Sequence, residues 1–112
     1  MINGAHVVVY SKDAEADKAF IKDVLKFDYI DAHQGWLIFK LPPSEIAVHP
    51  SDENDRHEFF LMTDDLEGEI AALKKAEITC EDPSQQSWGR LTRIKLPGGG
   101  TLGLYQPRHA RP

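Results

Sequence analysis

An internal echo in the sequence constrains the fold more than any other feature. Residues 6–13 read HVVVYSKD and residues 57–65 read HEFFLMTDD; each segment opens on a His, runs through apolar residues and reaches an Asp, where a helical pattern begins. A chain of 112 residues has the length of one ordinary domain. We therefore expect a single domain of two similar units, residues 4–50 and 57–107, with a linker at 51–56 and a flexible tail at 108–112.

The spacing of apolar residues predicts the same order of elements in both units. Runs of β-branched and aromatic residues favour strands, and apolar residues recurring every three or four positions favour amphipathic helices. The first unit is predicted to contain a strand at 6–10, a helix at 14–26 and strands at 27–31, 36–41 and 45–49. The second is predicted to contain a strand at 57–63, a helix at 66–74 and strands at 78–80, 88–96 and 101–106. The expected fold class is α+β, with two βαβββ modules forming curved mixed sheets and helices on the outer face.

Composition excludes several classes of protein. The net charge of −5 and the pI near 5.4 argue against nucleic acid as the main partner, because phosphate binding needs clustered Lys and Arg. No run approaches the roughly 18 apolar residues of a membrane span. No basic residue precedes the first apolar stretch, so we expect no secretory signal and a cytoplasmic protein. The single cysteine, Cys80, excludes an internal disulfide and a multi-Cys zinc site.

Three stretches together resemble the vicinal oxygen chelate superfamily, which groups glyoxalase I, bleomycin-resistance proteins and extradiol dioxygenases. They are HVVVYSKDAEADKAFIKDVLKFDYI, HEFFLMTDDLEGEIAALKKAEI and SWGRLTRIKLPGGGTLGLYQP. The last is similar to the family's closing hairpin, in which a Trp-Gly pair opens one strand and a Gly-rich turn precedes a strand ending in Leu-Tyr-Gln. The resemblance spans nearly the whole chain and implies the fold expected above.

The resemblance also implies where a metal would bind. Catalytic members hold a divalent metal (Fe, Mn, Ni or Zn) with one side chain from the first strand and one carboxylate from the last strand of each unit. His6 and His57 match the first pair, whereas the carboxylate positions hold Ala47 and Gly103. The metals of this family prefer mixed nitrogen and oxygen ligands. Glu45 or His49, two residues from Ala47 on the same strand face, could complete a site with the two histidines.

Metal-free members of the family imply a different use of the same cavity, to hold an apolar or aromatic compound. By strand alternation, Val8, Tyr10, Phe59 and Leu61 share the inward side with the two histidines. Small residues at the carboxylate positions would leave room for a guest. The predicted ligand-binding residues are Tyr10, Trp36, Phe39, Ala47, Phe59, Trp88, Arg90, Gly103 and Tyr105.

Three functional classes remain open on the sequence alone. The first is a metal-independent protein that binds a small organic molecule without a cofactor. The second is an enzyme of the glyoxalase, dioxygenase or lyase type with a metal held by His6, His57 and Glu45. The third is a non-catalytic domain for dimerisation or regulation. We expect a homodimer in all three, because in this family the units complete a cavity by pairing within or between chains.

Overall fold

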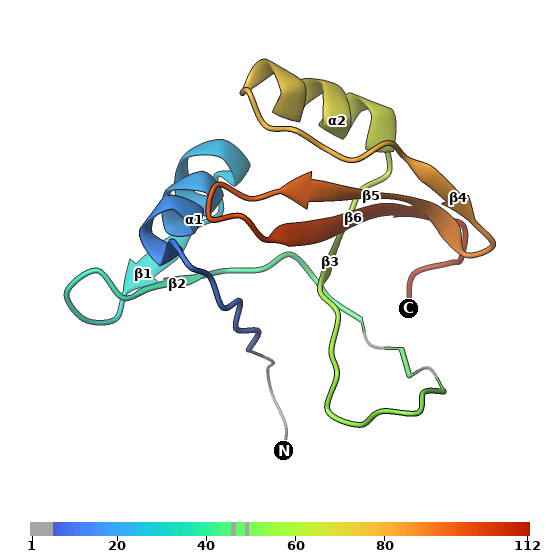
Figure 1. Cartoon of the computed structure of the whole chain (residues 1–112), viewed down its shortest axis with the longest axis horizontal. Coiled ribbons are helices and arrows are strands. Elements are labelled where there is room, and N and C mark those ends of the chain that lie inside the picture. Colours follow the sequence, from blue (N-terminus) through green and yellow to red (C-terminus); the bar gives the residue numbers. More distant parts are fainter. Residues whose placement is uncertain (1–5, 46, 49) are drawn as a thin grey trace.

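The computed structural model of the chain describes residues 6–45, 47–48 and 50–112 (Figure 1). Its elements, in chain order, are α1 (Ala14–Phe20), a π-helical turn η1 (Ile21–Leu25), β1 (Tyr29–Asp31), β2 (Leu37–Phe39), β3 (Phe60–Met62), α2 (Leu66–Lys75), β4 (Ser84–Gln86), β5 (Gly89–Lys95) and β6 (Thr101–Pro107). The strands form one sheet of two and one of four, so the predicted α+β class is confirmed. In these ranges no helix has the length and apolar character needed to cross a membrane.

The first helix begins and ends where its sequence predicts. Asp13 caps it, since its Oδ1 accepts a hydrogen bond from the backbone N–H of Ala16 at 3.1 Å and satisfies a donor of the first turn. The turn η1 continues α1, and Lys26 ends it in the left-handed conformation with a φ of 59°, a common way to terminate a helix. The predicted helix at 14–26 is therefore α1 and η1 together.

The second half of the chain forms the four-stranded sheet, in the order β3-β6-β5-β4. β3 is parallel to β6, and β5 is antiparallel to both β6 and β4. The strand predicted at 78–80 is reduced to one bridge, between Cys80 and Ile94. The polar stretch 81–87, predicted as a loop, contains β4 instead. Pairing with the free edge of β5 outweighs the low strand propensity of these residues.

The helix α2 lies over one face of this sheet (Figure 1). Leu66 and Leu73 of α2 are buried together with Ile94, Leu102 and Leu104 of the sheet, and Phe20 of α1 belongs to the same cluster. Each buried Leu or Ile side chain contributes about 1.5–3 kcal/mol. This core fixes which face of the sheet is covered by α2 and which is left open.

The first half of the chain forms less of a sheet than its sequence predicts. Among the described residues of this half, only β1 and β2 pair, as an antiparallel hairpin. The prediction of a strand at 6–10 is wrong for this chain: these residues carry no strand, and Val8 and Tyr10 are 59% and 92% exposed. Of the strand predicted at 45–49, residues 46 and 49 lie outside the described chain, and 45, 47 and 48 form no strand.

The two halves differ in whether their opening segment has a strand to pair with, and this difference explains why residues 6–10 form no strand. In the second half, the opening strand β3 hydrogen-bonds to the closing strand β6. In the first half, residues 6–10 run away from the four-stranded sheet without a neighbouring strand (Figure 1). An extended segment without a partner has little stability in water, whatever its β-propensity.

A buried hydrogen bond joins the two halves in addition to the packing of Phe20 in the shared core. Asp17, in α1, is 6% exposed, and its carboxylate accepts a hydrogen bond from the backbone N–H of Gly98 at 2.8 Å. Gly98 belongs to the turn between β5 and β6, where Gly99 has a φ of 100° that other residues adopt only with strain. The Gly-rich turn is therefore both a sheet connection and an attachment point for α1.

Candidate functional site

One face of the four-stranded sheet points away from the core. Because successive side chains of a strand alternate between faces, buried Leu102 and Leu104 face α2, whereas Gly103 and Tyr105 face the other way. The pairing register extends this second face across β3 and β5. We call it the open face, and its residues are Phe60, Met62, Leu91, Arg93, Gly103 and Tyr105.

Three aromatic side chains meet at the open face: Phe60 from β3, Trp88 immediately before β5 and Tyr105 from β6. The ring centroids lie 5.2 Å apart for Trp88 and Tyr105, 5.7 Å for Phe60 and Tyr105, and 6.1 Å for Phe60 and Trp88. All three pairs are edge-to-face, the geometry that ring quadrupoles favour. Trp88 is 36% exposed and Tyr105 only 9%. The indole of Trp88 is therefore partly open to solvent, whereas the Tyr105 side chain is buried.

Gly103 makes room for this cluster. A Cβ on Gly103 would contact the Phe60 ring and lie 2.6 Å from its Cε1 atom. A side chain at position 103 and the present position of Phe60 are therefore incompatible. The ring of Phe60 lies against Gly103 and occupies the space that a carboxylate side chain at this position would need.

The charged groups of the open face come from β5 and from the segment before β3. The guanidinium of Arg93 lies 5.6 Å from the centre of the Phe60 ring, within the range of a cation–π interaction. Arg93 also pairs with Glu58 at 3.6 Å, and Arg56 pairs with the same carboxylate at 3.0 Å. These groups are partly exposed, so each pair contributes about 0–1 kcal/mol. Arg56, Glu58 and Arg93 together form a polar rim beside the aromatic cluster.

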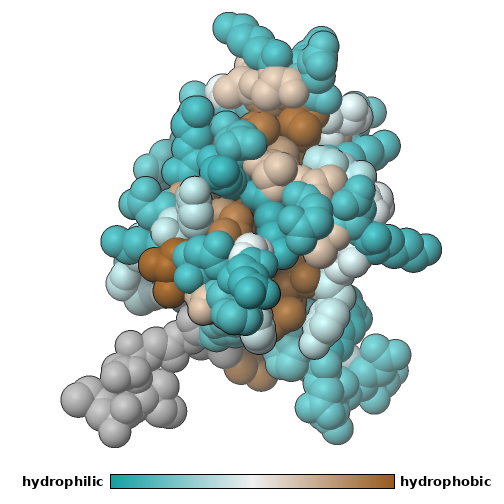
Figure 2. Space-filling view, turned by 90° about the vertical axis from the view of Figure 1, so that its left-hand side faces the viewer, coloured by the Kyte–Doolittle hydropathy of each residue, from teal (hydrophilic) through white to brown (hydrophobic). Residues whose placement is uncertain are grey.

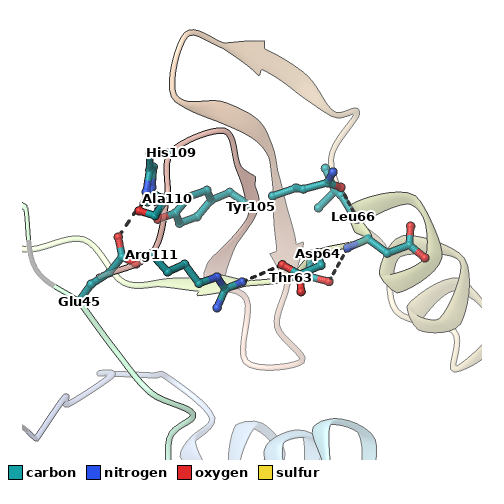
Figure 3. A network of polar contacts seen from close by, with 10 residues as sticks. Glu45, Thr63, Asp64, Leu66, Tyr105, His109, Ala110 and Arg111 are labelled. Carbon is teal, nitrogen blue, oxygen red and sulfur yellow. Dashed lines mark hydrogen bonds and ion pairs between the residues drawn. The ribbon is translucent and has the colours of Figure 1, made fainter.

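The segment after β6 folds back over Tyr105 (Figure 3). Nε2 of His109 lies 3.4 Å from the Tyr105 hydroxyl and 3.7 Å from Oε2 of Glu45. Burial raises the pKa of Tyr105, the negative charge of Glu45 raises it further, and Arg111 lowers it. The tyrosine therefore keeps its proton at neutral pH and can donate a hydrogen bond.

Comparison with solved structures identifies the fold. No family model and no curated relative matches the sequence. The antibiotic binding protein TnmS3 of Streptomyces sp. CB03234 aligns with a TM-score of 0.66 at 23% identity, over 96% of this chain and 99% of that one. A glyoxalase/bleomycin resistance protein from the same organism gives 0.62 at 24% identity, over 88% and 95%. Lactoylglutathione lyase of Agrobacterium tumefaciens gives 0.65 at 18%, over 93% and 92%.

The chain has the vicinal oxygen chelate fold. The resemblance predicted from the sequence is confirmed at the level of fold, and the matches extend over nearly all of this chain and of each neighbour. Among the neighbours are both an antibiotic binding protein and a lyase, so this fold alone does not decide between binding and catalysis. The choice between binding and catalysis depends on the residues of the site.

The residues predicted to hold a metal do not come together as a metal site of the vicinal oxygen chelate kind. His6 and His57 are exposed and lie outside any strand. Glu45 contacts His109 rather than either of them, and His49 lies outside the described residues. Within the described chain, no group of three or more His, Cys, Asp or Glu side chains could hold a metal ion. This donor set does not fit the metal that the fold implies.

The predicted ligand-binding residues divide between two faces and two halves. Trp88, Gly103 and Tyr105 lie at the open face, as described above. Phe59 packs against the core, and Arg90 pairs with Glu67 of α2 at 2.7 Å on the helix side of the sheet. In the first half, Phe39 contacts Tyr29 at a centroid distance of 5.8 Å, and Tyr10, Trp36 and Ala47 are exposed and belong to no strand of the four-stranded sheet.

Phe60 and Arg93 are the site residues that sequence reasoning missed. Counting alternation from His57 places Phe59 inward, whereas the structure places Phe60 there, one residue along the strand. A one-residue change of register moves every side chain of a strand to the other face. The sequence does carry the correct signal in β6, where two leucines flank Gly103 and identify the core side.

A separate groove of about 450 Å³ lies between η1, α2 and the helix side of the sheet. It is lined by Val24, Phe27, Leu61, Ala72 and Leu104, among others. Several of these residues belong to the core or pack against it. The groove is therefore the incomplete packing between the two halves, on the opposite side of the sheet from the aromatic cluster.

Proposed function

We propose that the protein binds a small organic molecule with an aromatic part on the open face, without a metal or other cofactor. The observation that carries this proposal is the cluster of Phe60, Trp88 and Tyr105, backed by the glycine at position 103. Aromatic faces beside a few polar groups are the usual lining of small-molecule sites. Arg93 and Glu58 supply polar groups at the rim.

The comparison with an antibiotic binding protein supports a binding function, because that neighbour has the same fold over 96% of this chain. The enzyme alternative needs a metal held by His6, His57 and Glu45, and the described geometry does not group these side chains. Ala47 and Gly103 supply no donor at the positions of the family's acids. Metal-independent binding is accordingly the function that the site supports best.

We also propose that the protein is a homodimer in the cytoplasm. Val7, Val8, Val9 and Tyr10 are each at least 43% exposed, and Ile30 and Trp36 of the same half are 65% and 67% exposed. Figure 2, viewed from the side of the β1–β2 hairpin, shows apolar patches between the hydrophilic side chains. Exposed apolar patches and unpaired extended segments favour association with another chain. A second copy would cover them.

Metal analysis of the purified protein, beside a His6→Ala/His57→Ala variant, tests the metal-free part of this proposal. We expect less than a stoichiometric amount of Fe, Mn, Ni or Zn in both proteins. One metal ion per chain that the variant loses would contradict the proposal and favour the enzyme.

A further inference from the structure

The imidazole ring of His109 lies beside Tyr105 of the aromatic cluster. The imidazole of His109 lies 6.2 Å from the Tyr105 ring centre, with the two planes inclined by 44°. Its Nδ1 is 3.0 Å from the carbonyl oxygen of Ala110, so Nδ1–H donates there and Nε2 faces the Tyr105 hydroxyl and Glu45 (Figure 3). The site that holds His109 therefore combines an aromatic surface, a hydroxyl and a carboxylate.

Few contacts hold this segment in place. The backbone N–H of Arg108 donates to the carbonyl of Trp88 at 2.9 Å. Arg111 pairs with Asp64 at 3.3 Å, and these side chains are 44% and 95% exposed. An ion pair this exposed adds little to stability. His109 can therefore move away from the Tyr105 hydroxyl without disturbing the core.

The charge around this position favours a cation. Glu45 is the acidic group that contacts His109, and its side chain is 25% exposed. Arg111 is the cation that acts on the same tyrosine, but its own partner is Asp64. When the segment moves away, Arg111 moves with it, whereas Glu45 belongs to a distant part of the chain. The vacated site then has a carboxylate without that competing cation.

We propose that the site formed by Tyr105 and Glu45 binds a planar aromatic cation, and that His109 is the chain's own occupant of this site. The inference rests on the proposed function and deepens it by naming the chemical class of the ligand. The aromatic ring of the ligand takes the place of the imidazole on Tyr105, and its charged group takes the place of Nε2 beside Glu45. Binding displaces the segment 108–112.

Benzamidine and benzamide provide a matched pair of probes, because they have nearly the same shape but only benzamidine is charged at neutral pH. The binding of each is followed by NMR, from the backbone amide shifts of Trp88 and Tyr105. The proteins compared are the unchanged chain, His109→Ala, and His109→Ala combined with Glu45→Gln. Glu69→Gln in the His109→Ala background is the control, because Glu69 is an exposed acid on α2.

We expect His109→Ala to bind benzamidine about threefold more tightly than the unchanged chain, and about fivefold more tightly than it binds benzamide. Glu45→Gln should abolish this preference, and Glu69→Gln should leave it. Equal binding of the two probes to His109→Ala, or a preference that survives Glu45→Gln, overturns this inference and leaves the proposed function standing. Binding of neither probe at the open face overturns both.

Discussion

Gly103 and Phe60 face each other across the parallel strands β3 and β6, and the phenylalanine ring lies where a side chain at position 103 would begin. This pairing connects fold and function. It places a ring at the centre of the open face, and it removes a carboxylate position that the resemblance assigns to metal binding. Gly103 therefore leaves space for the Phe60 ring and supplies no side-chain ligand for a metal.

Gly103→Ala should destabilise the protein by about 1–3 kcal/mol, because overpacking forces side chains or backbone to move. The added methyl group would displace Phe60 from its contacts with Trp88 and Tyr105. Urea denaturation measures the change in the free energy of unfolding. Gly100→Ala is the control, because a Cβ there meets no atom within 4 Å; equal effects of the two substitutions would show that the contact with Phe60 does not matter.

Asp17→Ala should cost about 1–3 kcal/mol, since it leaves the backbone N–H of Gly98 without its partner. Asp17→Asn should recover part of the loss, because an amide oxygen can accept the same hydrogen bond. Thermal and urea unfolding measure both variants. Asp23→Ala, at an exposed acid of η1, should change stability by about 0.5 kcal/mol or less; if it costs as much as Asp17→Ala, the buried contact is not what joins the halves.

Arg93→Ala should weaken the binding of indole about threefold, because Arg93 lies on the open face against Phe60 and its cation–π contact is of moderate strength. Arg90→Ala should leave indole binding unchanged, because Arg90 pairs with Glu67 on the helix side. Fluorescence or NMR titration gives both dissociation constants. The assignment of faces fails if Arg90→Ala is the variant that weakens binding.

Val8→Asp should shift the protein from dimer to monomer in light scattering, because it puts a charge into the exposed apolar segment 7–10 that a second copy would cover. Lys12→Asp, at an exposed charged position nearby, should leave the dimer intact. A monomeric unchanged chain at high micromolar concentration would contradict the dimer.

The sequence predicted the second half of the fold well and the first half poorly, and local physics explains both. In the second half, strong alternation, the cap Asp65 and the Gly-rich turn specify a helix and a hairpin through nearby residues. The segment 6–10 has equally strong β-propensity, but it forms no strand without a distant partner.

The candidate site was predictable in part for the same reason. Trp88, Gly103 and Tyr105 follow from the closing hairpin, whose register is local. Phe60 depends on the parallel register of β3 with β6, which two adjacent phenylalanines leave open. The contact of His109 with Glu45 joins segments far apart in sequence, and no local pattern encodes it.

Titration of ¹⁵N-labelled protein with indole in the presence of EDTA tests the central claim most directly. The account predicts saturable amide shifts centred on Phe60, Leu91, Gly103 and Tyr105, unchanged by EDTA and lost in Phe60→Ala/Trp88→Ala. Shifts confined to the groove beside α2, or binding that EDTA abolishes, would contradict a metal-independent aromatic site on the open face.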